Sequence, residues 1–300
     1  MTAGVTSPWS RFTPFAGTWQ GVAKEPVEQL IEMAVHEDGA LADITTAVTV
    51  DDETRAVGSF IAKEHGIVAG LPVAEMVFAH VDEYILFASV ALDGDDVQAG
   101  QEIARITGSA ETILVCERIA LNFLQRMSGI ATQTGQFVAA VRHTNATILD
   151  TRKTVPGFRE LDKYSVACGG GQNHRANLGA GVLIKDNHIA AAGGITPVLR
   201  RVNGFRTDYM TVEIEVDRLD QIEEALAGRP DIVLLDNMTV GQLGEAVKLI
   251  DRRALTEASG GVTLETVGAI AETGVDFISV GSLTHSVRAL DISLDMELTT

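Results

Sequence analysis

With 300 residues and 46% hydrophobic content, the chain is long enough for one large folded domain and a smaller one. Its formal net charge of -18, without a long basic stripe, excludes nucleic acid as the main partner, because affinity for a phosphate backbone comes mostly from Lys and Arg. No apolar run approaches the roughly 18 residues of a membrane span, the start lacks the apolar segment of a signal peptide, and two cysteines are too few for a disulfide framework. We therefore expect a cytoplasmic protein without a membrane partner.

The first third of the chain is predicted to form an α/β sandwich. Residues 1 to about 22 are weakly patterned and are expected to form a loose arm. Apolar residues recur at helical spacing from Val27 to Ala34 and predict an amphipathic helix. The acidic residues that follow fit a helix end and an N-cap better than a metal site. From Thr54 to Gly108, short apolar runs separated by glycines predict the strands of a sheet.

Residues 111–143 have the longest helical pattern, with apolar residues at three-to-four spacing along one face. We expect a break near Gly129 and a second helix from there to His143. Arg118, Asn122 and Gln125 share a polar stripe, which on residue pattern alone is typical of a solvent-facing surface.

From Thr147 onward, the pattern predicts a repeating order of strand, loop and helix. Six strands are predicted, at residues 147–150, 182–185, 211–216, 231–235, 254–258 and 277–280. The later strand ends recur every 21 to 23 residues, which is typical of βα units in a parallel barrel. Six units are fewer than the eight of a full barrel. The predicted fold is therefore α/β, with an N-terminal α/β sandwich domain and linker helix (1–128), an incomplete, open α/β barrel (129–288), and a tail (289–300) packing back on the first domain.

Basic residues are concentrated between Thr151 and Ile189, where six Arg or Lys residues stand against three acidic ones in a negative protein. Three consecutive glycines interleave with them, and glycine runs occur mainly where a chain bends tightly or approaches a ligand. Arginine forks match carboxylates in bidentate fashion, so the cluster describes a site for a planar, multiply charged acid. The residues assigned to it are Arg152, Lys153, His174, Arg175 and Lys185.

The last two strands are followed by small residues: Ser259, Gly260 and Gly261 after one, Gly281 and Ser282 after the other. Loops of this kind present free backbone N–H groups, and barrels commonly build phosphate sites from their last two loops. Glu215 and Asp236 end two neighbouring strands, and a carboxylate pair beside phosphate suits Mg²⁺, bound directly or through water. The alternative is that the pair only balances the charge of neighbouring Lys and Arg residues.

Several motifs then occur in a fixed order: DTRKTVPGFRELDKYSVACGGGQNHR, LIKDNHI, VEIEV, LLDN, EASGG and VGSLTHS. With ERIALNFLQRMSGIAT and HEDGALADITT, they resemble the motif series of the quinolinate phosphoribosyltransferase family, also called nicotinate-nucleotide pyrophosphorylase (carboxylating). The resemblance covers about Val27 to Ala289. It implies a Mg²⁺-dependent enzyme that transfers phosphoribosyl from phosphoribosyl pyrophosphate to quinolinate with decarboxylation. The products would be nicotinate mononucleotide, pyrophosphate and CO₂, in NAD biosynthesis.

By position, the resemblance assigns catalytic roles to Lys153, Lys185, Glu215 and Asp236. It implies that substrate is held by Arg118, Thr151, Arg152, Lys153, His174, Arg175, Lys185, Glu215, Asp236, Ser259, Gly260, Gly261, Gly281 and Ser282. Glu215 and Asp236 would also hold the metal. A homodimer with shared active sites is implied, or a larger oligomer, in which Arg118 reaches into the partner's site and is no longer a mere solvent-face residue.

Three positions depart from the family pattern: Ala167 and Ala180, where the family usually has an arginine and an acid, and Ala42, where it has glycine. A paralogue with a different aromatic acid is therefore one alternative. A second is a barrel lyase that forms a Schiff base through Lys185, since a desolvated lysine is a good nucleophile. A third is a sensor that binds phosphoribosyl compounds without turnover.

Overall fold

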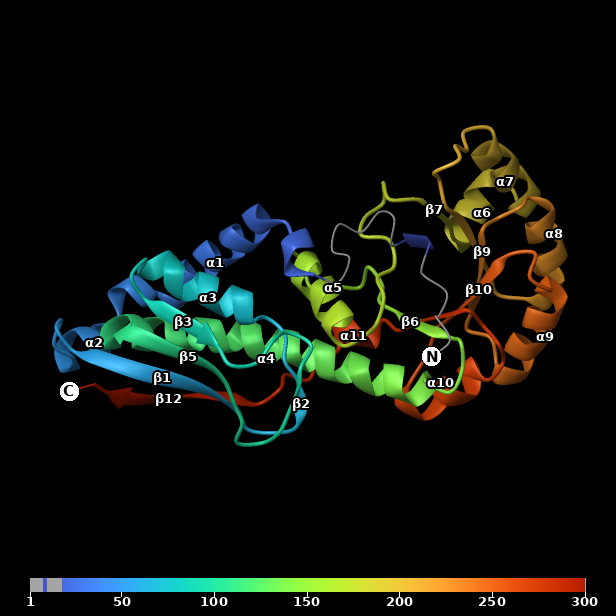
Figure 1. The fold of residues 1–300 in the computed structure, drawn as a ribbon. Coiled ribbons are helices and arrows are strands. Elements are labelled where there is room, and N and C mark those ends of the chain that lie inside the picture. The colour runs from blue at the N-terminus through green and yellow to red at the C-terminus, as the bar shows by residue number, and fades with distance from the viewer. Residues whose placement is uncertain (1–7, 10–17, 300) are drawn as a thin grey trace. The chain divides into compact units, whose positions relative to one another are not determined.

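The computed structural model describes residues 8–9 and 18–299, so the predicted loose arm lies mostly outside the described residues. The chain forms two compact units. We call Gln136–Lys153 and Gly171–Ser282, with Trp9, the barrel unit, and the described residues of Phe15–Gly135, Thr154–Gly170 and Leu283–Thr300 the sheet unit. Each unit is described by itself (Figure 1).

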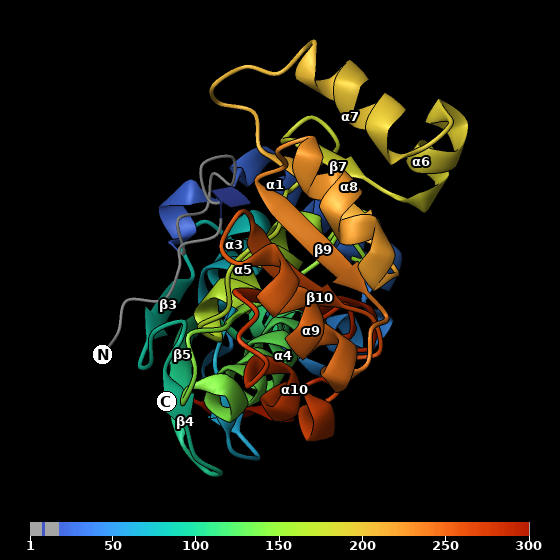
Figure 2. The same cartoon turned by 90° about the vertical axis from the view of Figure 1, so that its right-hand side faces the viewer.

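The sheet unit is built on a four-stranded antiparallel sheet in the order β12-β1-β5-β3. Its strands are β1 (Arg55–Ala62), β3 (Leu86–Ser89), β5 (Glu102–Ser109) and β12 (Ile292–Leu298), and a small second sheet pairs β2 (Gly66–Ile67) with β4 (Asp96–Val97). Every second residue of β1 is buried, so one face of the sheet carries the core. Helices α1 (Lys24–Asp38), α3 (Leu71–Val81) and α4 (Ala110–Val141) lie on that face (Figures 1 and 2).

The C-terminal segment completes this sheet. Strand β12 runs antiparallel to β1, with Ile292 opposite Ala62 and Leu298 opposite Ala56. The short helix α2 (Ile44–Thr49) begins at Asp43, whose carboxylate accepts a hydrogen bond from the Thr45 N–H at 2.9 Å. This is the N-cap that the sequence favoured over a metal site.

The strand prediction for residues 54–108 was wrong at α3. This helix begins after Gly70, whose φ of +104° suits glycine, and the Asp93 carboxylate accepts from the backbone N–H groups of Gly70 and Leu71. Pro72 occupies the first turn, where its missing N–H costs nothing. The helix is missed by pattern because it is apolar almost throughout, and a continuous apolar run has no clear helical period.

The predicted break near Gly129 was also wrong, since α4 runs for 32 residues without interruption. A Cβ at Gly129 would overlap the backbone carbonyl of Arg288 and touch the Cα of Ala289. Gly129 therefore allows a close approach of two chain segments within the sheet unit.

We expect Gly129→Ala to lower the free energy of unfolding by about 1–3 kcal/mol, because a backbone carbonyl must shift to admit the methyl group. Helix propensity alone predicts the opposite sign, a gain of about 1 kcal/mol. Gly244→Ala is the matched control: it lies inside the helix α9 (Val240–Ile250) with no atom within 4 Å of the added Cβ. Chemical denaturation measures both; a stabilised Gly129→Ala would contradict the packing argument.

The barrel unit contains all six predicted strands, as a parallel sheet in the order β6-β11-β10-β9-β8-β7. They are β6 (Thr147–Leu149), β7 (Val182–Ile184), β8 (Val212–Val216), β9 (Ile232–Asp236), β10 (Leu255–Ser259) and β11 (Phe277–Ser279). The sheet has β6 and β7 at its two ends, which confirms the open α/β barrel.

Helices alternate with these strands and lie outside the sheet (Figures 1 and 2). They are α6 (Asp186–Ala192), α7 (Ile195–Asn203), α8 (Ile222–Ala227), α9 and α10 (Leu264–Ala271), followed by the short α11 (Ser282–His285). Helix α5 (Arg159–Cys168) belongs to the sheet unit. No helix among the described residues is both long and apolar enough to span a bilayer.

Candidate functional site

The register of the parallel sheet decides which side chains share its inner face. Asp236 at the end of β9 lies level with Ser259 of β10, and Ser259 lies level with Ser279 of β11. Two residues before Asp236 on β9, Leu234 lies level with Glu215 of β8 on one side and with Glu257 of β10 on the other. Paired residues of parallel strands point the same way, as do residues two apart along one strand. Glu213, Glu215, Asp236, Glu257 and Ser259 therefore face the same side, toward the strand ends where barrels place their chemistry.

Lys185 joins this set from the end of β7. Its ammonium Nζ lies 3.0 Å from the Glu215 carboxylate Oε2, and its side chain is half exposed. The structure thus brings together one predicted cation and one predicted carboxylate of the site. The ion pair also limits the rotamers available to Glu215.

The Asn173–Arg175 segment is held against the end of β6 by Asp150. This carboxylate is completely buried; it accepts from the Asn173 side-chain amide at 2.6 Å and from the His174 backbone N–H at 2.9 Å. Two hydrogen bonds to a charged acceptor are strong, so this segment is fixed to the strand end. The NHR motif is therefore positioned by a residue 23 or 24 positions earlier in the chain.

Arg175 is an almost fully buried cation, with 4% of its surface exposed. Its Nη1 donates to the Gly181 carbonyl at 2.9 Å, while its Nε has no hydrogen-bond partner among the described residues. Burial lowers the pKa of the Arg175 guanidinium, and repulsion from Arg152 lowers it further, but an arginine still remains charged at neutral pH. Two arginines close enough to repel each other are stabilised when an anion binds between them.

Glu213 and Glu257 lie beneath this segment, both completely buried. The Glu213 Oε2 is 3.1 Å from the His174 Nε2, and the Glu257 Oε1 is 3.7 Å from the same nitrogen. Burial raises the pKa of the carboxyl groups of Glu213 and Glu257, which favours the protonated form of the pair. The Trp9 ring stacks on the other side of His174, with ring centroids 4.8 Å apart. Neither glutamate was predicted as a site residue, although the VEIEV and EASGG motifs contain them.

The loop after β10 is shaped by contact with the loop after β9. Gly260 has a φ of +96°, and a Cβ there would overlap the side chain of Asn237. The Asn237 N–H donates to the Ser259 carbonyl at 2.8 Å, and its side-chain amide donates to the Asp236 carboxylate at 2.7 Å. Asn237 therefore connects the predicted metal ligand Asp236 to the predicted phosphate loop.

Gly260→Ala is expected to weaken binding of a phosphoribosyl donor about tenfold or more, because the methyl group must displace Asn237 and, with it, Asp236. Gly261→Ala is the control: Gly261 also has a positive φ, +61°, but no atom lies within 4 Å of its added Cβ. Calorimetric titration of both variants checks the prediction. Equal losses would mean that backbone strain rather than the Asn237 contact is responsible.

The remaining predicted residues divide between the two units. Thr151, Arg152 and Lys153 follow β6, where the Thr151 hydroxyl accepts from the Lys153 N–H at 3.1 Å. Gly281 and Ser282 follow β11, at the start of α11. Arg118 is exposed on α4 in the sheet unit. Two members of the basic cluster, Arg159 and Lys163, lie on α5 in that unit, and Lys163 is completely buried, so the six basic residues do not form one surface.

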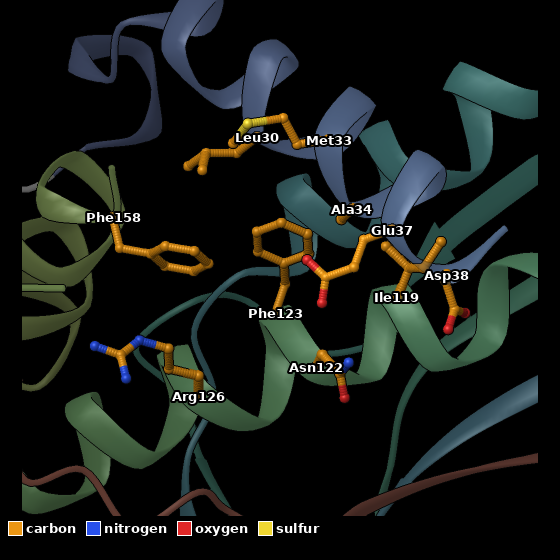
Figure 3. Close-up of a pocket in the computed structure, with 10 residues that line it drawn as sticks. All are labelled: Leu30, Met33, Ala34, Glu37, Asp38, Ile119, Asn122, Phe123, Arg126 and Phe158. Carbon is orange, nitrogen blue, oxygen red and sulfur yellow. The ribbon is translucent and has the colours of Figure 1, made fainter. Parts of the chain in front are cut away.

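The sheet unit has a pocket of its own, of about 360 Å³, between α1, α4 and the start of α5 (Figure 3). Its lining residues are Leu30, Met33, Ala34, Glu37, Asp38, Ile119, Asn122, Phe123, Arg126 and Phe158. Phe123 and Phe158 stack at 5.6 Å, and the Arg126 guanidinium lies over Phe158 while bonding Asp162 at 2.9 Å. Arg118 lies one helical turn before Asn122, so α4 carries it past the edge of this pocket.

The donor set at the barrel rim fits a hard cation. Glu215 and Asp236 offer only carboxylate oxygens on one face of the sheet, and each carries a second oxygen beside the one bonded to Lys185 or Asn237. Two carboxylates leave room for waters and substrate oxygens, as Mg²⁺ requires.

Comparison with known proteins matches both halves of the chain to one family. Residues 130–295 match the model of the quinolinate phosphoribosyl transferase C-terminal domain, and residues 43–128 that of the N-terminal domain. The nicotinate-nucleotide pyrophosphorylase (carboxylating) of Mycobacterium leprae is 46% identical over 273 residues, covering 89% of this chain and 95% of the relative. The chloroplastic enzyme of the same name from Arabidopsis thaliana is 44% identical, with coverage of 90% and 83%. The solved nicotinate-nucleotide pyrophosphorylase from Francisella tularensis superposes with a TM-score of 0.88 at 38% identity, covering 92% of this chain and 98% of that one.

Proposed function

Since this chain belongs to the quinolinate phosphoribosyl transferase family, we propose that it transfers the phosphoribosyl group of phosphoribosyl pyrophosphate to quinolinate with loss of CO₂. The products are nicotinate mononucleotide, pyrophosphate and CO₂. The observation that carries this proposal is the almost fully buried Arg175 guanidinium, which lies close enough to Arg152 to be repelled by it and would be stabilised by a bound anion. Quinolinate, a planar dicarboxylate, supplies that anion.

The acceptor is bound by the cations of the barrel rim. Arg152, Lys153, Arg175 and Lys185 surround the two carboxylates, with Thr151 beside them and His174 in the same segment. The pyridine nitrogen then attacks the ribose C1 as pyrophosphate departs. No protein nucleophile is needed, so the rate enhancement comes from holding two mutually repelling anions side by side in a reactive orientation.

The donor is bound at the later strand ends. Ser259, Gly260 and Gly261, with Gly281 and Ser282, offer backbone N–H and hydroxyl groups to the 5-phosphate. Glu215 and Asp236 hydrogen-bond the ribose hydroxyls and would hold Mg²⁺, directly or through water. The bound metal would supply positive charge beside the departing pyrophosphate. The Lys185–Glu215 ion pair at 3.0 Å keeps Glu215 in place for this role.

Decarboxylation uses the same groups. After transfer the ring nitrogen is cationic and stabilises the carbanion left when the adjacent carboxylate departs as CO₂. A proton from solvent then adds to this carbon and gives nicotinate mononucleotide. Lys153 and Lys185 hold the reacting groups in place as this charge moves through the ring. The surrounding cations stabilise the carboxylate before it leaves as much as the carbanion that forms. Most of the driving force for decarboxylation therefore comes from the cationic ring nitrogen.

We further propose a homodimer with shared sites, in which Arg118 enters the partner's acceptor site. The support is its exposed position on α4, one turn from the pocket of Figure 3. Met33 at the pocket edge is 60% exposed, as expected of a surface that a second copy covers. We place the enzyme in the cytoplasm, consistent with Cys116 and Cys168 being free thiols.

The test is an assay of the purified protein with phosphoribosyl pyrophosphate, Mg²⁺ and quinolinate. Formation of nicotinate mononucleotide and CO₂ in equal amounts is expected, with loss of activity on chelation and recovery on adding Mg²⁺. Nicotinic acid and other pyridine acids run in parallel decide the paralogue alternative. If quinolinate gives neither product, the proposal fails; tight donor binding without any product would identify a sensor.

A Schiff-base lyase has no support at Lys185. Its side chain is half exposed and paired with Glu215, the opposite of the desolvated surroundings that make a lysine amine nucleophilic.

A further inference from the structure

His174 is held by protein groups at both ring nitrogens. The Arg175 backbone N–H donates to Nδ1 at 2.8 Å, so Nδ1 carries a lone pair and no proton. The neutral ring must then carry its proton on Nε2, which faces the Glu213 Oε2 at 3.1 Å and donates to it. Rotating the ring by 180° would place carbon atoms against both partners, so this orientation alone satisfies both hydrogen bonds.

These contacts leave His174 ill suited to bind an anion directly. A neutral imidazole with its single N–H engaged by a buried carboxyl oxygen has no further donor to offer a substrate carboxylate. The same geometry speaks against a metal at the cluster of His174, Glu213 and Glu257, whose ligand atoms lie within 4.8 Å of one another. A metal on Nε2 would leave a neutral ring with its proton on Nδ1, where it would oppose the Arg175 N–H.

We infer that Glu213 and Glu257 are positioning residues of the acceptor site, and that they act through His174 on Arg175. Glu213 bonds the His174 ring, Glu257 lies 3.7 Å from the same nitrogen, and the ring bonds the backbone of Arg175. Trp9 stacks on the ring from the other side, and Gly181, where a Cβ would overlap Trp9, makes room for it. Gly181 also accepts the Arg175 Nη1 hydrogen bond, so both the backbone and the guanidinium of Arg175 are fixed by the same small cluster.

This inference deepens the proposed function and rests on it for the identity of the acid. Glu213→Ala removes the acceptor for the Nε2 proton and so weakens the hold on the His174 ring. We expect the KM for quinolinate to rise about tenfold or more, with the KM for phosphoribosyl pyrophosphate unchanged within about twofold. Glu213→Gln keeps an oxygen that can accept from Nε2 and should stay within about threefold of the parent enzyme.

Three kinetic outcomes contradict the inference: both KM values rising together, no change in the quinolinate KM, or equal losses for the alanine and glutamine variants. A joint rise of both KM values is the result expected if Glu213 has only a structural role. An enzyme inactive with every pyridine acid before any substitution would instead refute the proposed function, so the two failures are distinguishable.

A spectroscopic measurement on the unsubstituted protein reads the protonation of the His174 ring directly. In nitrogen-15 histidine-labelled protein, a variant is needed only for assignment: His174→Asn identifies the His174 signals by their loss. We expect a bare Nδ1 and a protonated Nε2, unchanged on adding quinolinate. A proton on Nδ1, a change of tautomer with quinolinate, or a shift of Nε2 on adding Mg²⁺ or Zn²⁺ alone would each overturn the assignment, the last in favour of a metal site.

Discussion

Replacing Arg175 by alanine is expected to raise the dissociation constant for quinolinate at least about 30-fold, or about 2 kcal/mol, because it removes a buried charged donor. The dissociation constant for phosphoribosyl pyrophosphate should stay within about threefold of the parent value, since the proposed donor contacts are at the ends of β8 to β11. Titration calorimetry with each ligand separately measures both. Arg175→Lys should recover little of the loss, because a lysine cannot form the bidentate contact of a guanidinium.

The control is Arg201→Ala, which removes one exposed positive charge from α7 and leaves the rim intact. It should leave both dissociation constants unchanged, which separates a local contact from the effect of net charge. If Arg175→Ala weakens donor and acceptor equally, Arg175 is not part of the acceptor site.

Mixing two inactive variants should restore activity if the sites are shared between subunits. Arg118→Ala and Lys185→Ala homodimers are each expected to lose most activity. In a mixed dimer, one site combines the intact barrel residues of the first subunit with the intact Arg118 of the second. About half of randomly re-formed dimers are mixed, and each restores one of two sites, so recovery should approach about a quarter of the parent activity.

Dissociation and re-formation of each variant alone is the control, and it should restore nothing. Activity that stays at the level of the separate variants, in a sample shown by mass to contain mixed dimers, would refute a site built across the interface. Full activity of the Arg118→Ala homodimer would likewise remove Arg118 from the site.

The barrel was predictable because its strands are short, buried on both faces and regularly spaced. The same regular spacing predicted that Lys185, Glu215, Asp236 and Ser259 lie on one rim, because residues at the carboxyl ends of parallel strands meet at the same edge of the sheet. The β8–β10 register places Glu215, Asp236 and Ser259 on one face of the sheet, and the 3.0 Å contact with Glu215 brings Lys185 to them. The metal, the dimer and the individual roles of these residues stay predictions.

What the sequence did not reveal depends on contacts between distant segments. In the sequence, Gly129 predicts a helix break. In the structure it leaves room for the Arg288 carbonyl, which a side chain at this position would overlap. Glu213 and Glu257 are separated by 44 positions and by the whole of β9, and nothing in their neighbourhoods marks them as partners of one histidine. Burial of a carboxylate is decided by the register of the sheet, which no local pattern contains.

The gap in the barrel has a consequence for solubility. Its two border strands, β6 and β7, are three residues each, too short to recruit a foreign strand by backbone pairing. On the β6 side, Gln172 donates its N–H to the Ile148 carbonyl and accepts from the Asp150 N–H, so the segment leading into the NHR motif shields that border. Changes made there to alter acceptor preference would therefore also uncover a strand edge, and aggregation should be monitored alongside activity in any such variant.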